Sequence, residues 1–358
     1  MTKDATTEKI SPTREDKFQA YSPSWINRLT AWVSRLPGTS WMYYLGLGVV
    51  LFLIPSIVNW SEGVLPSGSF LPVQGFMPGV IGFFLAMFHY LDKRAGVSLA
   101  AMRPALKVSE GEYQELNYRL TNLPAGMTLI ASLITLAIIL FTEFVDDPYH
   151  IEVLNISPVS TNLFRLIYFF GWWVLGAYLY HAIHQLRLIN RIYTQHTRVN
   201  LFRMKPLYAF SNLSALTAGS IAMVLYGWMA VAPGVSLADP IAFILTFIVL
   251  LIAVVIFIWP QLGIHNLQVA EKDRLLEEAN QRFEAIIGEL HRRVDAGELD
   301  QMNDLRVTMT NLEMELNALK GIHTWPWQSE TVRWLITALV LPLGLWLIQS
   351  VFQRVLAP

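Results

Sequence analysis

The hydrophobic residues of this chain are gathered into seven long runs, separated by polar and charged segments. Each run holds 18 to 23 residues and ends at charged residues, Pro or Gly. About 20 residues of α-helix cross a bilayer core roughly 30 Å thick. The pattern therefore predicts an all-α, polytopic membrane protein with seven transmembrane helices. The predicted helices are 41–60, 70–91, 127–144, 163–183, 208–230, 241–262 and 331–351.

An amphipathic pattern fills the segment between the sixth and seventh runs. Apolar residues recur there at helical spacing in two stripes, and Asp295, Ala296 and Gly297 supply a turn between them. Two such helices are expected to pack as an antiparallel, coiled-coil-like hairpin. The first stripe begins just after Trp259 and Pro260, so we expect the sixth helix to continue into the hairpin. The stripes are Ile264, Leu267, Leu275, Ala279, Phe283, Ile286, Leu290 and Val294, then Leu299, Met302, Leu305, Met309, Leu312, Leu316 and Leu319.

The charges predict how these helices are oriented. Lys and Arg lie almost entirely in 1–40, 92–124, 185–206 and 263–330. Positively charged short loops stay in the cytoplasm, which places the amino terminus and the hairpin inside and the carboxyl terminus outside. The predicted divisions are a cytoplasmic arm (1–40), six membrane helices (41–262), a cytoplasmic hairpin (263–330), and a seventh helix with a short external end (331–358). The outer side holds Arg165 and Arg354 with the carboxylates Glu62, Glu143, Asp146, Asp147, Glu152 and Asp239.

Composition supports the membrane class and excludes some chemistry. Hydrophobic residues make up 54% of the chain and charged residues 15%, which is too apolar for an ordinary soluble protein. The absence of cysteine excludes structural disulfides, thiolate metal sites and a cysteine nucleophile. No cleavable signal or organelle address is recognisable, so the expected location is a prokaryotic plasma membrane.

Trp325, Pro326 and Trp327 join the hairpin to the seventh helix. Indole rings favour the membrane interface, and the proline ends the preceding helix. We interpret the element as an interfacial corner that anchors the chain, with a gating hinge as the alternative.

Polar residues within the spans suggest two further sites, each with a simpler interpretation. His181 and His184 are one turn apart and could share a metal with a carboxylate from another helix, although histidines are common at interfaces. The small residues of the fifth helix form a seam that favours close helix packing, or leaves room for a ligand. The seam is Ser211, Ala215, Gly219 and Ala222.

Enzyme signatures are missing from the sequence. It has no P-loop, no His-Glu-x-x-His, no Gly-x-Ser-x-Gly and no dinucleotide fingerprint, so we expect neither catalysis nor a cofactor. The hairpin from residue 266 to 320 holds seven basic and twelve acidic residues, which favours a basic protein partner and disfavours nucleic acid.

In plan the chain resembles the insect odorant and gustatory receptor channels. The shared features are seven helices, an internal amino terminus, long cytoplasmic helical extensions and a last helix that ends near the chain terminus. The signature of that family's last helix is not matched, because Thr337 is followed by Ala338 and the nearest Gln is Gln349. The resemblance implies a homotetramer in membrane lipid, a central cation pore lined by the seventh helices, and an outer pocket for a small-molecule ligand.

The leading interpretation is an oligomeric, cation-permeable, chemoreceptor-like channel. At helical spacing, the seventh helix presents one face toward a pore, with Leu341 and Ile348 as apolar constrictions and Pro342 and Gly344 permitting a bend. The alternative is a non-conducting membrane sensor or scaffold whose acidic hairpin docks a cytoplasmic partner; an enzyme or transporter comes third. The expected pore-lining residues are Arg333, Thr337, Leu341, Gly344 and Ile348.

Overall fold

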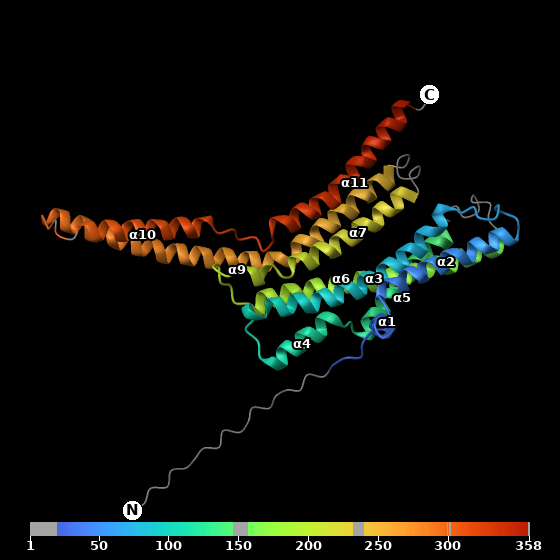
Figure 1. Cartoon of the computed structure of the whole chain (residues 1–358), viewed down its shortest axis with the longest axis horizontal. Coiled ribbons are helices and arrows are strands. Elements are labelled where there is room, and N and C mark those ends of the chain that lie inside the picture. The colour runs from blue at the N-terminus through green and yellow to red at the C-terminus, as the bar shows by residue number, and fades with distance from the viewer. Residues whose placement is uncertain (1–19, 146–156, 232–239, 299, 301, 357–358) are drawn as a thin grey trace, which may run out of the picture.

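The computed structural model describes residues 20–145, 157–231, 240–298, 300 and 302–356 (Figure 1). Within these residues the chain forms ten α-helices and no strand, which confirms the all-α class. In chain order the elements are α1 (Trp25–Val33), α2 (Ser40–Ser61), α3 (Pro72–Met102), the 3₁₀ turn η1 (Arg103–Ala105), α4 (Glu110–Thr121), α5 (Ala125–Val145), α6 (Pro158–His196), the 3₁₀ turn η3 (Lys205–Tyr208), α7 (Ser211–Val231), α9 (Pro240–Asp295), α10 (Met302–Gly321) and α11 (Ser329–Leu356).

Six of the described helices, α2, α3, α5, α6, α7 and α9, are long and apolar enough to cross a membrane. Their outer surfaces carry large apolar side chains that no other part of the described chain covers, such as Phe141 (68% exposed) and Leu166 (65% exposed). Lipid can cover such surfaces at no hydrophobic cost, and the helices satisfy their own backbone groups. The chain is therefore a polytopic membrane protein. The seventh predicted span falls in α11, which is not among these six helices, and its membrane crossing remains a prediction.

Several of the predicted spans are shorter than the helices that contain them. The second predicted span ends at residue 91 and the fourth covers 163–183, whereas α3 continues to Met102 and α6 runs from Pro158 to His196. Charged residues end a hydrophobic run, but they do not end a helix that continues into water. The segment 92–124, expected to be a loop, contains the end of α3 and the whole of α4.

Two short helices were not predicted, and local hydrogen bonds explain both. The α1 helix begins after Ser24, whose side chain accepts from the backbone N–H of Asn27. The α4 helix begins after Ser109 in a capping box, in which Ser109 and Glu112 each accept from the other's backbone N–H. Since Ile26 of α1 is fully buried in the main core, residues 25–33 of the predicted arm belong to the folded bundle.

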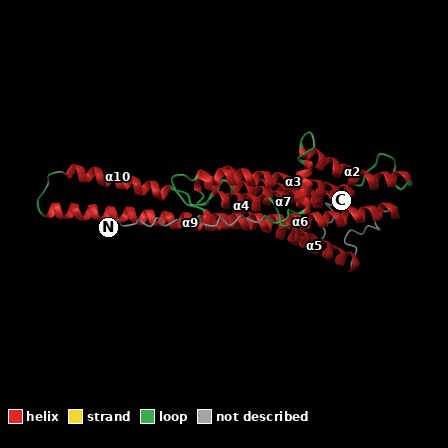
Figure 2. Ribbon diagram, turned by 90° about the horizontal axis from the view of Figure 1, so that it is seen from below, coloured by secondary structure: helices red, strands yellow, loops and turns green. Residues whose placement is uncertain are grey.

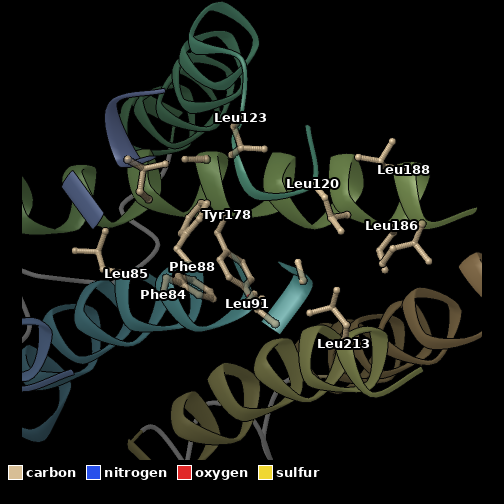
Figure 3. Packing of buried hydrophobic residues seen from close by; sticks show 14 of the residues in the cluster. Phe84, Leu85, Phe88, Leu91, Leu120, Leu123, Tyr178, Leu186, Leu188 and Leu213 are labelled. Carbon is tan, nitrogen blue, oxygen red and sulfur yellow. The ribbon is translucent and has the colours of Figure 1, made fainter. Parts of the chain in front are cut away.

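The main core lies between α3 and α6. Figure 3 shows Phe84 and Phe88 of α3 pointing toward Tyr178 of α6. The Phe84 and Tyr178 rings stack with centroids 4.3 Å apart, and Phe88 meets Tyr178 edge to face at 5.4 Å. The Tyr178 hydroxyl also hydrogen bonds with the Ser220 hydroxyl of α7. This aromatic cluster joins three of the long helices.

The α5 helix packs on the opposite side of α6 at a close backbone approach. A Cβ added to Gly176 of α6 would lie 2.5 Å from the carbonyl oxygen of Ala131 in α5. Only glycine fits there without moving the backbone of one helix.

The α9 helix is a single helix of 56 residues that belongs to two parts of the molecule. Its first part packs beside α7 and α11, and its second part lies alongside α10 and extends beyond the bundle (Figures 1 and 2). The two stripes face each other in this hairpin, where Ala279, Leu316 and Leu319 are buried. Gly297 supplies the turn with a φ of +71°, and Leu299 lies outside the described residues.

The small-residue seam of α7 is a packing surface. Ala215, Ala218 and Ala222 are buried in a second core with Leu335 and Leu339 of α11 and with residues of α9. A Cβ on Gly219 would lie 2.9 Å from the Trp334 ring of α11, so the seam brings α11 close to α7.

Candidate functional site

The Trp325-Pro326-Trp327 corner is held against α9 by a continuous stack of rings. Trp327 stacks on Phe257 of α9 with centroids 5.3 Å apart, and Trp325 stacks on Trp327 at 4.3 Å. His265 of α9 then stacks on Trp325 at 3.9 Å, with the two planes 9° apart. Nδ1 of His265 donates to the carbonyl oxygen of Thr324 at 3.0 Å. The four rings and this hydrogen bond fix the corner along two turns of α9.

The end of α10 is fixed to the same helix. Nζ of Lys272 in α9 donates to the carbonyl oxygens of Lys320 and Ile322, each at 2.8 Å. These carbonyls belong to the last turn of α10 and the residue after it, where backbone acceptors lack helical partners. Pro326, between the two tryptophans of the corner, is buried. The hairpin and the start of α11 are therefore connected through contacts with α9 as well as through the chain.

The expected pore-lining residues share one face of α11. Arg333 and Thr337 are exposed in the first half of the helix, Leu341 is 56% exposed and Ile348 is 55% exposed. Gly344 is half-buried. No other element of the described chain covers this face.

The opposite face of α11 packs inward. Leu335 and Leu339 are 4% and 8% exposed, and they contact the apolar residues of α7 and α9 in the second core. The Tyr226 hydroxyl of α7 donates to the Leu339 carbonyl oxygen. The inner face therefore holds α11 to α7 and α9, and the predicted pore face is left uncovered by the described residues.

A buried polar cluster joins α1, α3 and α6. Nε2 of His181 in α6 lies 2.8 Å from Oδ1 of Asp92 in α3, and the two side chains are only 1% and 15% exposed. Nδ2 of Asn27 in α1 donates to the other Asp92 oxygen at 3.2 Å and to the Thr121 carbonyl oxygen at 3.2 Å. Oδ1 of Asn27 accepts from the backbone N–H of Leu123 at 2.9 Å. The cluster binds three helices and the α4–α5 connection around one carboxylate.

The neighbouring histidines bind other partners. Nε2 of His184 donates to the Arg119 carbonyl oxygen at 3.0 Å. In His89, Nδ1 lies 3.0 Å from the Tyr44 hydroxyl and Nε2 lies 3.4 Å from the Ser34 hydroxyl. Within the described residues no group of three or more His, Cys, Asp or Glu is arranged to hold a metal. Asp92 is a carboxylate from another helix, but it contacts His181 alone while His184 donates to a backbone carbonyl, so the described residues do not arrange the three groups around a metal.

Sequence reasoning missed Asp92, which it placed in a cytoplasmic loop. A signal for it exists: His89 and Asp92 are spaced i, i+3 on α3, as His181 and His184 are on α6. Each pair lies on one face of its helix. Two such pairs at the same ends of two neighbouring spans are a pattern typical of a buried polar contact.

The acidic outer side is described only in part. Glu143 of α5 pairs with Arg165 of α6 at 3.0 Å, so this carboxylate joins two helices. The predicted rim residues Asp146, Asp147, Glu152 and Asp239 lie outside the described residues. Arg165, the basic residue that the charge pattern predicts on the outer side, is thus the partner of a carboxylate predicted on the same side.

No protein-family model, curated protein or solved structure matches this chain. Its function is therefore inferred from its own residues.

Proposed function

We infer that this chain forms an oligomeric, cation-permeable channel of chemoreceptor type in a prokaryotic plasma membrane, with α11 lining the pore. A homotetramer is the assembly that the resemblance to the insect receptor channels implies. The function is non-enzymatic and needs no cofactor. The observation that supports it most is the two-sided character of α11, which packs inward through Leu335 and Leu339 and leaves the Arg333 to Ile348 face uncovered.

The order of residues along this face suits a gated path. Arg333 and Thr337 provide polar groups at one end, where the arginine can reach water. Leu341 and Ile348 follow as exposed apolar side chains. When such side chains from several subunits meet, they close a pore by excluding water.

The test is conductance of the purified chain in planar bilayers. Leu341→Ser and Ile348→Ser, made singly, should raise the leak current severalfold, because a hydroxyl in the constriction favours wetting. Leu339 makes a poor control, since it is buried and its replacement would disturb packing. Val340→Ser is better matched: Val340 is 59% exposed and lies about 80° or more around the helix axis from both residues. It should leave the current unchanged.

The pore assignment is wrong if neither the parent nor any variant conducts, or if all three variants behave alike. Mass measurement in detergent gives an independent check, because a monomer has no shared pore.

A second function is favoured by the projecting hairpin of α9 and α10 (Figure 1). Its surface lies well away from the membrane helices, as the surface of a docking scaffold would. Five of its carboxylates already form ion pairs with its own arginines, and they are Glu271, Glu278, Glu289, Glu298 and Glu315. The remaining carboxylates are available to a basic partner. An oligomer of the expected mass that carries no current would favour this sensor or scaffold over a channel.

A further inference from the structure

Two adjoining clefts open where the hairpin meets the membrane helices. The larger has a volume of about 760 Å³ and lies along the start of α11. The smaller, of about 510 Å³, lies between η3 and the same end of α11. Tyr208 and Gln328 line both, so the clefts are continuous.

The clefts carry unpaired positive charge. Arg333 and His323 line the larger and Lys205 the smaller. Within the described residues, neither Arg333 nor Lys205 forms a salt bridge or a side-chain hydrogen bond, and both are exposed. Glu330 lines the smaller cleft and is the only carboxylate among the residues that line either. The two fixed cations outnumber it, so the local charge favours an anion.

The larger cleft also has an apolar wall. Val332 and Ile336, on either side of Arg333 in the sequence, line it on α11, and the stacked rings of Trp325 and Trp327 line it at the corner. Ile336 is 55% exposed. A small free anion would leave this wall in contact with water, whereas a ligand with a charged head and an apolar chain would cover it.

We propose that these clefts bind an anionic phospholipid, with its phosphate between Arg333 and Lys205 and an acyl chain along Val332 and Ile336. A guanidinium binds phosphate oxygens in a two-pronged geometry, and an ammonium adds a point charge. Tryptophan rings at this level suit the boundary between headgroups and acyl chains. The site shares Arg333 with the mouth end of the proposed pore face, but lipid binding does not depend on whether the protein conducts.

Thermal unfolding of the purified, full-length chain in neutral detergent tests this. Phosphatidylglycerol should raise the midpoint in a saturable way, because it binds the folded state. Phosphatidylcholine should raise it less at the same concentration, and inorganic phosphate should not raise it. A rise with phosphate alone would indicate a free-anion site, and equal rises with both lipids would indicate an apolar groove without charge recognition. Either result overturns the proposal.

Four variants assign the effect to the clefts. Lys205→Gln and Arg333→Gln should each raise the phosphatidylglycerol concentration for half-maximal shift by about fivefold, the ordinary effect of one cation near an anionic lipid. Arg203→Gln, which removes an exposed cation that does not line either cleft, should change nothing. Glu330→Gln should lower the concentration, because it removes the repelling charge. The proposal is wrong if Arg203→Gln weakens binding as much as Arg333→Gln, or if Glu330→Gln fails to strengthen it.

Discussion

Among single residues, Asp92 and His181 have the largest expected effect on stability because both lie inside the bundle. Asp92 accepts a hydrogen bond from Asn27 of α1 on one carboxylate oxygen and contacts His181 of α6 through the other, so each oxygen has a partner. Removing one partner of a buried pair leaves the other group without compensation, and this costs more than replacing both.

His181→Ala should therefore lower the free energy of unfolding by about 3 kcal/mol. Asp92→Asn should cost less, because the amide keeps the shape and removes the charge. Combining Asp92→Asn with His181→Ala should cost less than the sum of the two single changes. Chemical unfolding in detergent measures all three. His291→Ala, in the exposed part of the hairpin, is the control, and an equal loss there would contradict a specific role for the pair.

The capping box of α4 predicts a pH dependence outside the membrane helices. Hydrogen bonds from the Ser109 backbone and hydroxyl hold the pKa of Glu112 below its ordinary value of 4.5. Because the folded-state pKa is lowered, the cap stabilises the fold fully above about pH 4.5, and this contribution is lost as the pH falls through the lowered pKa.

Ser109→Ala should lower the thermal midpoint by about 2 °C at pH 7, the scale expected for one lost N-cap in a chain of this size. The difference between parent and variant should shrink as the pH falls below the ordinary glutamate value. A difference that grows on acidification would show that the capping box does not hold the charged form of Glu112.

At the residue scale, little of the candidate site could be predicted. His181 contacts a residue 89 positions away, and His265 stacks on a tryptophan 60 positions later. The pattern along one helix indicates which face is apolar, but it does not indicate which turn of another helix it meets. The chemistry of Trp325 predicts an interfacial anchor, and this stays a prediction. Its stacking on His265 depends on how α9 and the corner pack.

At the scale of elements, the hairpin illustrates what periodicity can predict. Leu305, Leu316 and Leu319 are buried as the stripe of α10 requires, because the spacing of three and four places them on one side of the helix. The helices α1 and α4 were not predicted, although Ile26, Leu29 and Val33 of α1 recur at helical spacing. Both helices are short. The α4 helix is mostly polar, and the position of α1 depends on its packing against α3.

Leu305→Asp combined with Leu312→Asp should unfold the hairpin. Leu305 is 8% exposed and Leu312 is half-buried. Each change therefore places a charge without a partner between α9 and α10. Val307→Asp combined with Met314→Asp is the matched control, because these side chains are 45% and 58% exposed on the same helix. Protease resistance of the segment 263–320 measures the result, and equal resistance in both double variants would mean that the stripe does not hold the hairpin.

At the scale of the whole molecule, the distribution of Lys and Arg predicts on which side of the membrane each end of the helices lies. This rule places the hairpin on the cytoplasmic side and the turn between α2 and α3 on the outer side. The chain has no native cysteine, so a single introduced thiol reports its own location.

Ser67→Cys should react with an impermeant thiol reagent on intact cells, whereas Ala296→Cys should react only after lysis. Both positions are exposed. Ala296 is preferable to Gly297, whose positive φ would strain any other residue. Labelling of Ala296→Cys without lysis would reverse the predicted orientation.

The length of α9 has a mechanical consequence. Its 56 residues span about 84 Å, of which the bilayer core takes about 30 Å. The remaining arm, about 50 Å long, continues the membrane part of the same helix across Pro260, so tilting the whole helix by about 10° would displace the hairpin tip by roughly 9 Å. The ring stack of Phe257, Trp327, Trp325 and His265 lies at the junction between the membrane part of α9 and this arm. A sideways pull on the hairpin thus becomes a torque at the first turn of α11.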